Sequence, residues 1–324
     1  MNAGINPGPM TLGDIFDRWF KLIGKTWLRN LILAAIILGP AALVFAVALD
    51  IGFSEMANLA GGSSDGMDPG SVFAMFEFFG WFILGTFLLV IGTIAATVAI
   101  TIVGAAEMSG RQLSWQEALS MTFGIRLVKV FAQYMLEIFG LGIIILIPYG
   151  LLFAGTAAES VLLGVLGGFL IFAALLVVVY AAISFAFTIP IIGWENEDII
   201  AAFRRSWNLV RGNWWRTFGI LILMGMIVSF AVSIIMTPLY IVVLWDFFKG
   251  YFEAMSSIGG GEPDPEVFRQ MFTSFGFGFG MINAVASVIE VIVAPLYVVV
   301  MYFDLRARHQ EFSPPGPSTT LPMV

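Results

Sequence analysis

The stretch that decides the fold is residues 197–218, EDIIAAFRRSWNLVRGNWWRTF, which is basic, rich in tryptophan and followed directly by a long apolar segment. Its apolar and basic residues recur at helical spacing, which predicts one amphipathic helix lying on a membrane surface. We expect its basic and indole side chains to contact lipid or a partner protein. These candidate contacts are Arg204, Arg205, Trp207, Arg211, Trp214, Trp215 and Arg216.

The composition indicates an integral membrane protein. Of the 324 residues, 59% are hydrophobic and 11% are charged, and the mean hydropathy is +0.95. A soluble protein of this size needs more charged side chains to cover its surface, so lipid must act as the solvent. The chain has no cysteine and a single histidine, His309. Thiol chemistry, zinc binding and histidine-based catalysis therefore have almost no residues to use.

Six apolar segments are long enough to cross a bilayer, which takes about 20 residues. They cover residues 31–51, 72–104, 130–153, 161–192, 217–245 and 275–303. The predicted fold is an all-α integral membrane protein with six transmembrane helices. Its membrane domain covers residues 11–304, between a flexible leader at 1–10 and a disordered cytoplasmic tail at 305–324.

A related amphipathic segment, TLGDIFDRWFKLIGKTWLRN, precedes the first span at residues 11–30. Thr11 and Asp14 have the spacing of a capping box, which predicts the start of a helix. Apolar and basic residues again occupy opposite sides, which predicts a second interfacial helix. Its candidate lipid or partner contacts are Arg18, Lys21, Lys25, Trp27 and Arg29. The alternative is a helix that only anchors and orients the first span.

The distribution of lysine and arginine predicts the orientation in the membrane. With the N-terminus in the cytoplasm, thirteen of the fifteen basic residues lie on the cytoplasmic side, and only Lys249 and Arg269 face outward. Such an excess of positive charge is typical of cytoplasmic segments. We therefore expect both termini to be cytoplasmic. Acidic residues gather on the predicted outer loops: Glu55, Asp65, Asp68, Glu262, Asp264 and Glu266.

The sequence also contains an internal repeat. A shift of 187 residues superimposes Phe16 on Phe203, Arg18 on Arg205, Leu22 on Leu209, Trp27 on Trp214 and Arg29 on Arg216. With a weaker match in the middle, this predicts three repeats of one interfacial helix plus two spans, at about 11–104, 107–192 and 195–303. Because the repeats share one orientation, their pseudosymmetry axis is expected to lie along the membrane normal.

Two acidic residues fall inside the predicted spans: Glu137 in the third and Glu290 in the sixth. One helix face of the sixth span carries Gly276, Gly280, Asn283, Ser287, Glu290 and Ala294, and we expect it to point inward, away from lipid. The candidate intramembrane polar site comprises Glu137, Asn283, Ser287 and Glu290. It predicts a path for protons or cations; the alternative is a protonated Glu290 bonded to a neighbouring helix.

The segment EDIIAAFRRSWNLVRGNWWRTFG with its proline-interrupted span, and the ending VVVMYFDLRARHQEF, resemble the membrane domain of the bacterial glycerophosphoryl diester phosphodiesterase family. The N-terminal LGDIFDRWFKLI is similar as well. The phosphodiesterase domain of that family, with its histidine pair and metal-binding carboxylates, has no counterpart in the chain. The resemblance therefore implies a stand-alone module of the bacterial cytoplasmic (inner) membrane.

The sequence contains neither H-E-x-x-H nor G-x-S-x-G, so no catalytic, cofactor-binding or metal-binding residue is predicted. We expect a non-enzymatic membrane module without a cofactor. Its basic helices would bind membrane lipids, anionic ones in particular, or a partner protein, and not nucleic acid. The alternative is a transporter or channel for a lipid-like or small substrate, using the polar face around Glu290.

Overall fold

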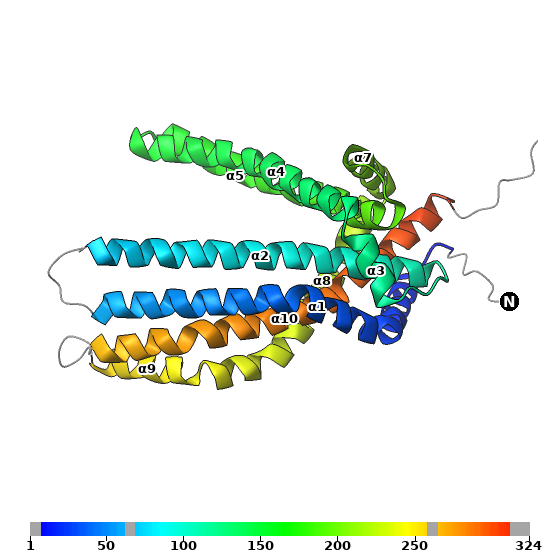
Figure 1. The fold of residues 1–324 in the computed structure, drawn as a ribbon. Coiled ribbons are helices and arrows are strands. Elements are labelled where there is room, and N and C mark those ends of the chain that lie inside the picture. The colour runs from blue at the N-terminus through cyan, green and yellow to red at the C-terminus, as the bar shows by residue number, and fades with distance from the viewer. Residues whose placement is uncertain (1–7, 62–68, 258–264, 312–324) are drawn as a thin grey trace, which may run out of the picture. The chain divides into compact units, whose positions relative to one another are not determined.

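The computed structural model describes residues 8–61, 69–257 and 265–311, which form helices and no strand. The elements are α1 (Leu12–Gly61), α2 (Pro69–Met108), α3 (Trp115–Thr122), α4 (Ile125–Ala157), α5 (Val161–Phe185), α6 (Thr188–Pro190), the π-helical turn η1 (Ile191–Glu195), α7 (Ile199–Val210), α8 (Trp214–Val243), α9 (Trp245–Ser257) and α10 (Pro265–Arg308) (Figure 1). Within these ranges, six helical segments are long and apolar enough to cross a membrane. This confirms the prediction of an all-α, multi-pass membrane protein.

The helices are longer than the sequence predicted. The amphipathic segment 11–30 and the first span form the single helix α1, which continues through Pro40. Asp14 accepts hydrogen bonds from the backbone N–H and the hydroxyl of Thr11, as predicted for the start of the helix. Beyond residue 245, α9 and the start of α10 occupy positions predicted as a loop. The polar composition of the segment after residue 245 therefore did not show where the helices begin and end.

The stretch 197–218 is not one helix, so that prediction is wrong. α7 ends at Val210, and α8 begins at Trp214. Gly212 lies between them with a φ of +88°, a backbone conformation that glycine adopts at little cost and other residues avoid. Trp214, Trp215 and Arg216 thus belong to the first turn of α8, whereas Trp207 belongs to α7.

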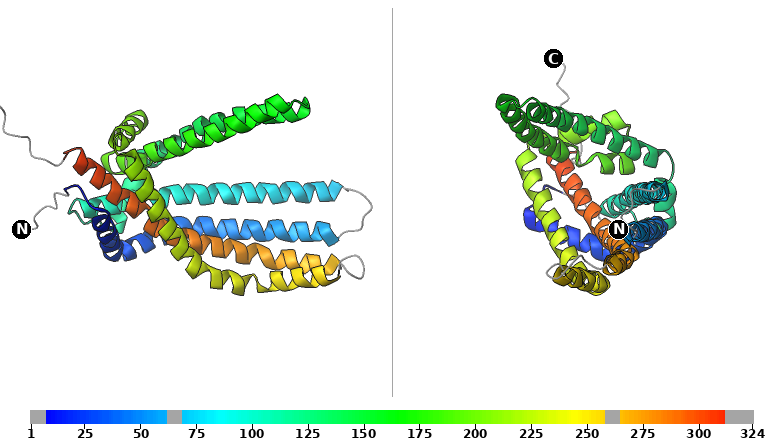
Figure 2. Two further views of the ribbon diagram at one scale, coloured as in Figure 1. Left: turned by 180° about the vertical axis from the view of Figure 1, so that it is seen from behind. Right: turned by 90° about the vertical axis from the view of Figure 1, so that its left-hand side faces the viewer.

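Contacts divide the chain into two compact units. Unit 1 contains residues 1–26, 101–224 and 295–324, and unit 2 contains residues 27–100 and 225–294. The parts of α1, α2 and α10 that belong to unit 2 lie side by side (Figures 1 and 2). A Cβ atom added to Gly280 would lie 2.6 Å from the Cα atom of Ala46, and one added to Gly276 the same distance from that of Asp50. Glycine therefore lets α10 approach the backbone of α1 closely.

Unit 1 contains the α4–α5 hairpin, in which glycine again permits close packing. A Cβ atom added to Gly155 would lie 2.5 Å from the backbone nitrogen of Gly164. Only 11% of the most apolar window of each helix is buried within the protein, so most of this apolar surface is open to the surroundings of the protein. α7 packs against the end of α5 through Ser206, whose hydroxyl donates to the carbonyl of Ser184 and accepts from the N–H of Phe187.

α10 continues to Arg308, so the first residues of the predicted disordered tail are helical. Met10, at the end of the predicted leader, is buried. Residues 312–324 of the tail and the acidic loop positions Asp65, Asp68, Glu262 and Asp264 lie outside the described residues.

Candidate functional site

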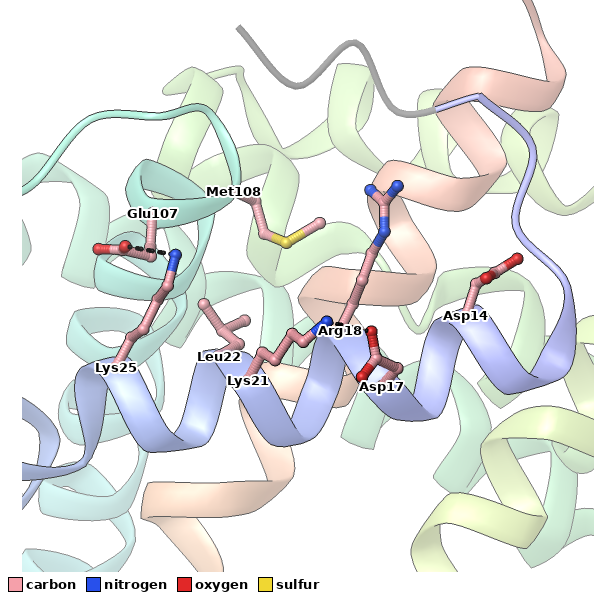
Figure 3. A pocket seen from close by; sticks show the side chains of 8 residues that line it. All are labelled: Asp14, Asp17, Arg18, Lys21, Leu22, Lys25, Glu107 and Met108. Carbon is pink, nitrogen blue, oxygen red and sulfur yellow. Dashed lines mark hydrogen bonds and ion pairs between the residues drawn. The ribbon is translucent and has the colours of Figure 1, made fainter. Parts of the chain in front are cut away.

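Three of the predicted basic residues of α1 come together in an open groove of about 350 Å³, here called the α1 groove. It is lined by Asp14, Asp17, Arg18, Lys21, Leu22, Lys25, Glu107 and Met108. All of these residues belong to unit 1. The close-up in Figure 3 shows that the end of α2, with Glu107 and Met108, lies across from α1. Sequence spacing placed the basic residues on one helix face but gave no sign that α2 closes the groove.

The cations of the α1 groove differ in their pairing. The Lys21 amine lies 2.6 Å from the carboxylate of Asp17, and the Lys25 amine lies 3.6 Å from that of Glu107. The side chain of the partly buried Arg18 makes no ion pair or hydrogen bond with any described residue. In Figure 3 its guanidinium extends away from α1 on the side where Met108 lies. Arg18 is thus the groove cation whose hydrogen-bonding capacity is unused in the described part of the chain.

A second hollow, the α7 pocket, has a volume of about 400 Å³. It is lined by Glu197, Ala201, Arg204, Arg205, Asn208, Leu209, His309 and Glu311. The ring nitrogen Nε2 of His309 lies 3.1 Å from the carbonyl oxygen of Leu209, to which it donates. His309 and Glu311 were predicted to lie in a disordered tail, so sequence analysis missed both. The sequence feature that could have pointed to them is that both are polar and directly follow a long helix.

Arg205 lies in a partly buried ion-pair network. One oxygen of Glu195 accepts hydrogen bonds from the guanidinium of Arg205, at 3.0 Å, and from the hydroxyl of Tyr302. The guanidinium of Arg306 lies 3.3 Å from the same oxygen. Glu311 accepts from Arg205 at 3.0 Å and from Arg306 at 2.6 Å. The network therefore fastens α7 to η1 and to the end of α10.

Arg216 belongs to a second closed cluster, the Asp304 clamp, formed by Met10, Arg216, Asp304 and Arg308. The fully buried carboxylate of Asp304 accepts from Arg216 at 2.5 Å, Arg308 at 3.1 Å and the N–H of Met10 at 2.7 Å. Both arginines also donate to the carbonyl of Met10, at 3.0 and 2.8 Å. A buried carboxylate is tolerated only when it is paired and hydrogen-bonded, and this one is satisfied by three donors.

Two arginines of the stretch 197–218 are exposed. The side chains of Arg204 on α7 and Arg211 just after α7 make no ion pair or hydrogen bond within the described ranges. Arg29 of α1 is partly buried. Among described His, Asp and Glu side chains, no group of three is arranged to hold a metal ion.

The predicted aromatic contacts also divide into packed and exposed rings. Trp214 stacks on Tyr180 with ring centres 5.2 Å apart, and its indole N–H donates to the Tyr180 carbonyl at 3.3 Å. Trp207 meets the same tyrosine edge-on at 5.4 Å. Trp215 and Trp27 are 78% and 54% exposed. Of the tryptophans in the stretch 197–218, Trp215 is therefore the one most available to lipid or a partner.

The four intramembrane polar residues are distributed over both units. Glu137, on α4, belongs to unit 1 and has Gln133 as its hydrogen-bonding neighbour one turn earlier. The amide of Asn283, on α10 in unit 2, accepts from the hydroxyl of Tyr240 at 3.4 Å. Ser287 is partly buried.

Glu290 is exposed, so the prediction that it points inward with the glycines of α10 is wrong. Gly276 and Gly280 do pack against α1. The predicted face repeats every 3.5 residues, whereas a straight helix has 3.6 residues per turn and rotates by about 20° per heptad. Two heptads after Gly276 that rotation amounts to about 40°, so Glu290 lies toward the edge of the face that Gly276 and Gly280 pack.

Comparison with known proteins places the chain in a family. The family model described as Domain of unknown function (DUF7847) matches residues 28–305, which include all six membrane-spanning helices at least in part. No curated protein and no solved structure matches the chain. Because the match covers most of the chain, the protein belongs to the family described as Domain of unknown function (DUF7847).

Proposed function

We propose that this membrane protein is a non-enzymatic module that binds anionic lipid headgroups through Arg204, Arg211 and Trp215. The observation that carries the proposal is the exposure of these three side chains, with both arginines unpaired among the described residues. A lysine or arginine near a membrane surface attracts anionic lipid with about 1 kcal/mol. Tryptophan is enriched at the same depth because its ring is apolar and its N–H is polar.

The amphipathic character of α7 supports an interfacial position for this surface. Ala202, Ser206 and Leu209 are buried on one side, whereas Ile200 and Arg204 are exposed on the other. A helix that exposes both an apolar and a basic side chain fits the boundary between lipid and water. We place it on the cytoplasmic side of a bacterial inner membrane, because positive charge is concentrated in the segments assigned to that side.

The proposed repeat gives the N-terminal part of α1 a related role. Arg18 and Trp27 correspond to Arg205 and Trp214 at the shift of 187 residues. Under this proposal, α1 and the α7–α8 segment are two copies of one interfacial element, and the membrane domain of the phosphodiesterase family is a distant relative of the whole chain. The two copies have diverged in which of their arginines are paired.

Selective lipid retention tests the proposed function. The protein is extracted with its surrounding lipid by an amphipathic polymer, and the bound lipids are quantified by mass spectrometry. The double variant R204Q/R211Q should lose enrichment of anionic lipid several-fold, since two charges are worth at most about 2 kcal/mol, or roughly thirtyfold.

The matched control is K249Q, which removes one exposed positive charge from α9 and leaves the α7 surface intact. Its lipid profile should equal that of the wild type. Unchanged enrichment in R204Q/R211Q, or an equal loss in K249Q, contradicts the proposal.

A further inference from the structure

We infer that the α1 groove binds a zwitterionic phosphate group of the phosphoethanolamine type, with its phosphate on Arg18 and its ammonium group at Asp14 and Asp17. This site is separate from the α7 surface and does not depend on the proposed function. The ligand chemistry has two sources, a membrane lipid headgroup and a soluble phosphate ester, which the experiment below distinguishes.

The phosphate position follows from the pairing within the groove. Lys21 and Lys25 already have carboxylate partners, whereas the Arg18 guanidinium forms no ion pair with a described residue and acts on Asp14 only at longer range. A guanidinium presents several N–H donors in a planar fork that matches a phosphate group. Arg18 is therefore the groove cation able to accept a phosphate without breaking an existing ion pair.

The floor of the groove strengthens that contact. Leu22 is 3% exposed, and the thioether of Met108 lies beside it in the groove lining. Apolar surface beside a charge lowers the local dielectric constant and increases the attraction between guanidinium and phosphate. Glu107, whose side chain is 9% exposed, holds the Lys25 amine near the same wall. The Lys25–Glu107 pair thus adds no net charge to that wall of the groove.

The ammonium position follows from the two aspartates. Asp14 uses its Oδ2 atom for both bonds from Thr11, and Asp17 uses its Oδ2 atom for Lys21. Neither Oδ1 atom accepts a hydrogen bond from a described residue. Asp14 and Asp17 are three residues apart and Arg18 follows four after Asp14, so all three occupy one helix face. One side of the groove therefore attracts an anion and the neighbouring side a cation.

The balance of charge also argues against a purely anionic ligand. The groove is lined by three acidic and three basic side chains. A phosphate group alone would approach Asp14 and Asp17 at a cost, because like charges repel. An amine carried on the same ligand turns that repulsion into attraction. This distinguishes the α1 groove from the α7 surface, where Arg204 and Arg211 are unpaired.

Binding is measured by calorimetry on the full chain in phosphatidylcholine nanodiscs, with phosphoethanolamine and inorganic phosphate as soluble probes. A parallel arm uses native mass spectrometry after phosphatidylethanolamine is added to the nanodiscs. R18Q should weaken binding of the zwitterionic ligand by about tenfold or more, as expected for a charge-assisted hydrogen bond. R18K should retain part of the affinity, because the charge remains but the fork is lost.

The variant D17N tests whether the groove binds the ligand directly, because a purely structural role of Asp17 would not change the binding of the two probes in opposite directions. It should weaken binding of phosphoethanolamine and strengthen binding of inorganic phosphate, because it removes a negative charge that attracts the amine, repels phosphate and neutralises Lys21. The control R111Q removes an exposed charge from the loop after α2, outside the groove, and should bind both probes like the wild type.

Binding of the soluble ester identifies a soluble ligand, and binding of the lipid alone identifies a membrane headgroup. Either outcome supports the site if R18Q weakens that binding by about tenfold or more. The inference is overturned if neither form binds, if R111Q and R18Q lose affinity equally, or if D17N changes both soluble probes in the same direction.

Discussion

Arg204 and Arg205 are neighbours in the sequence, yet they face opposite environments. Arg204 is exposed and has no ion pair among the described residues, whereas Arg205 contacts Glu195 and Glu311 at 3.0 Å. Successive residues of an α-helix point about 100° apart, so one side chain of α7 faces outward while the next faces η1 and α10. A run of arginines in an amphipathic helix is therefore not one functional surface.

The same contrast separates Arg211 from Arg216. Arg211 is exposed in the turn between α7 and α8, whereas Arg216 donates to the buried carboxylate of Asp304. The outward arginines are available to a ligand, and the inward arginines hold the segment in place. Substitutions on the two sides should consequently change different quantities: lipid selectivity on the outside and stability on the inside.

The largest effect is expected in the Asp304 clamp. D304N keeps the shape of the side chain but leaves the Arg216 and Arg308 guanidiniums beside a neutral amide. Breaking a buried ion pair costs about 3–5 kcal/mol, and the lower end applies here because these arginines are 27% and 26% exposed. Thermal unfolding in detergent should show a markedly lower Tm. The exposed control R211Q should change stability by less than about 0.5 kcal/mol, and an unchanged Tm in D304N would contradict a structural role.

A smaller effect is expected when the two neighbouring arginines are compared directly. R205Q should lower the free energy of unfolding by about 1–2 kcal/mol, since its ion pairs are partly exposed and partly screened. R204Q should leave stability unchanged and reduce the enrichment of anionic lipid. Unfolding curves and lipid analysis on the same two preparations separate these outcomes. Equal behaviour of the two variants in both measurements would remove the distinction between the faces of α7.

The number of spans and the basic face of α1 could be predicted, because both depend on local hydropathy and on helical spacing. The ion-pair and hydrogen-bond partners that are distant in the sequence could not be predicted. Asp304 is 88 residues from Arg216 and 294 residues from Met10 in the sequence. Spacing within one helix shows which residues share a face, but not which other helix that face contacts. Glu107 and Glu195 were missed as partners for the same reason.

Two errors came from extending a local pattern too far. The stretch 197–218 was predicted as one helix because its amphipathic spacing continues across Gly212, which instead breaks the helix with a positive φ. Glu290 was assigned to the packed face of α10 because small and polar residues recur before it. Only the tight contacts at Gly276 and Gly280 define that face. In both cases a backbone feature, rather than composition, sets the limit of the pattern.

The smallest effect concerns the start of α7, where Asp198 and Lys129 form an exposed ion pair at 2.8 Å. The hydrogen bond and the charge of Lys129 hold the pKa of Asp198 below its ordinary value of 3.8. A lowered pKa means that the pair stabilises the folded state above pH 3.8, and that this contribution is lost as the pH falls through the folded-state pKa. The loss should be small, because Lys129 also donates to the carbonyls of Asn196 and Glu197. The rate of hydrogen exchange in the first turn of α7 should therefore differ between wild type and D198N at neutral pH, and the two rates should converge in acid. A difference that persists in acid would show that Asp198 acts through another contact.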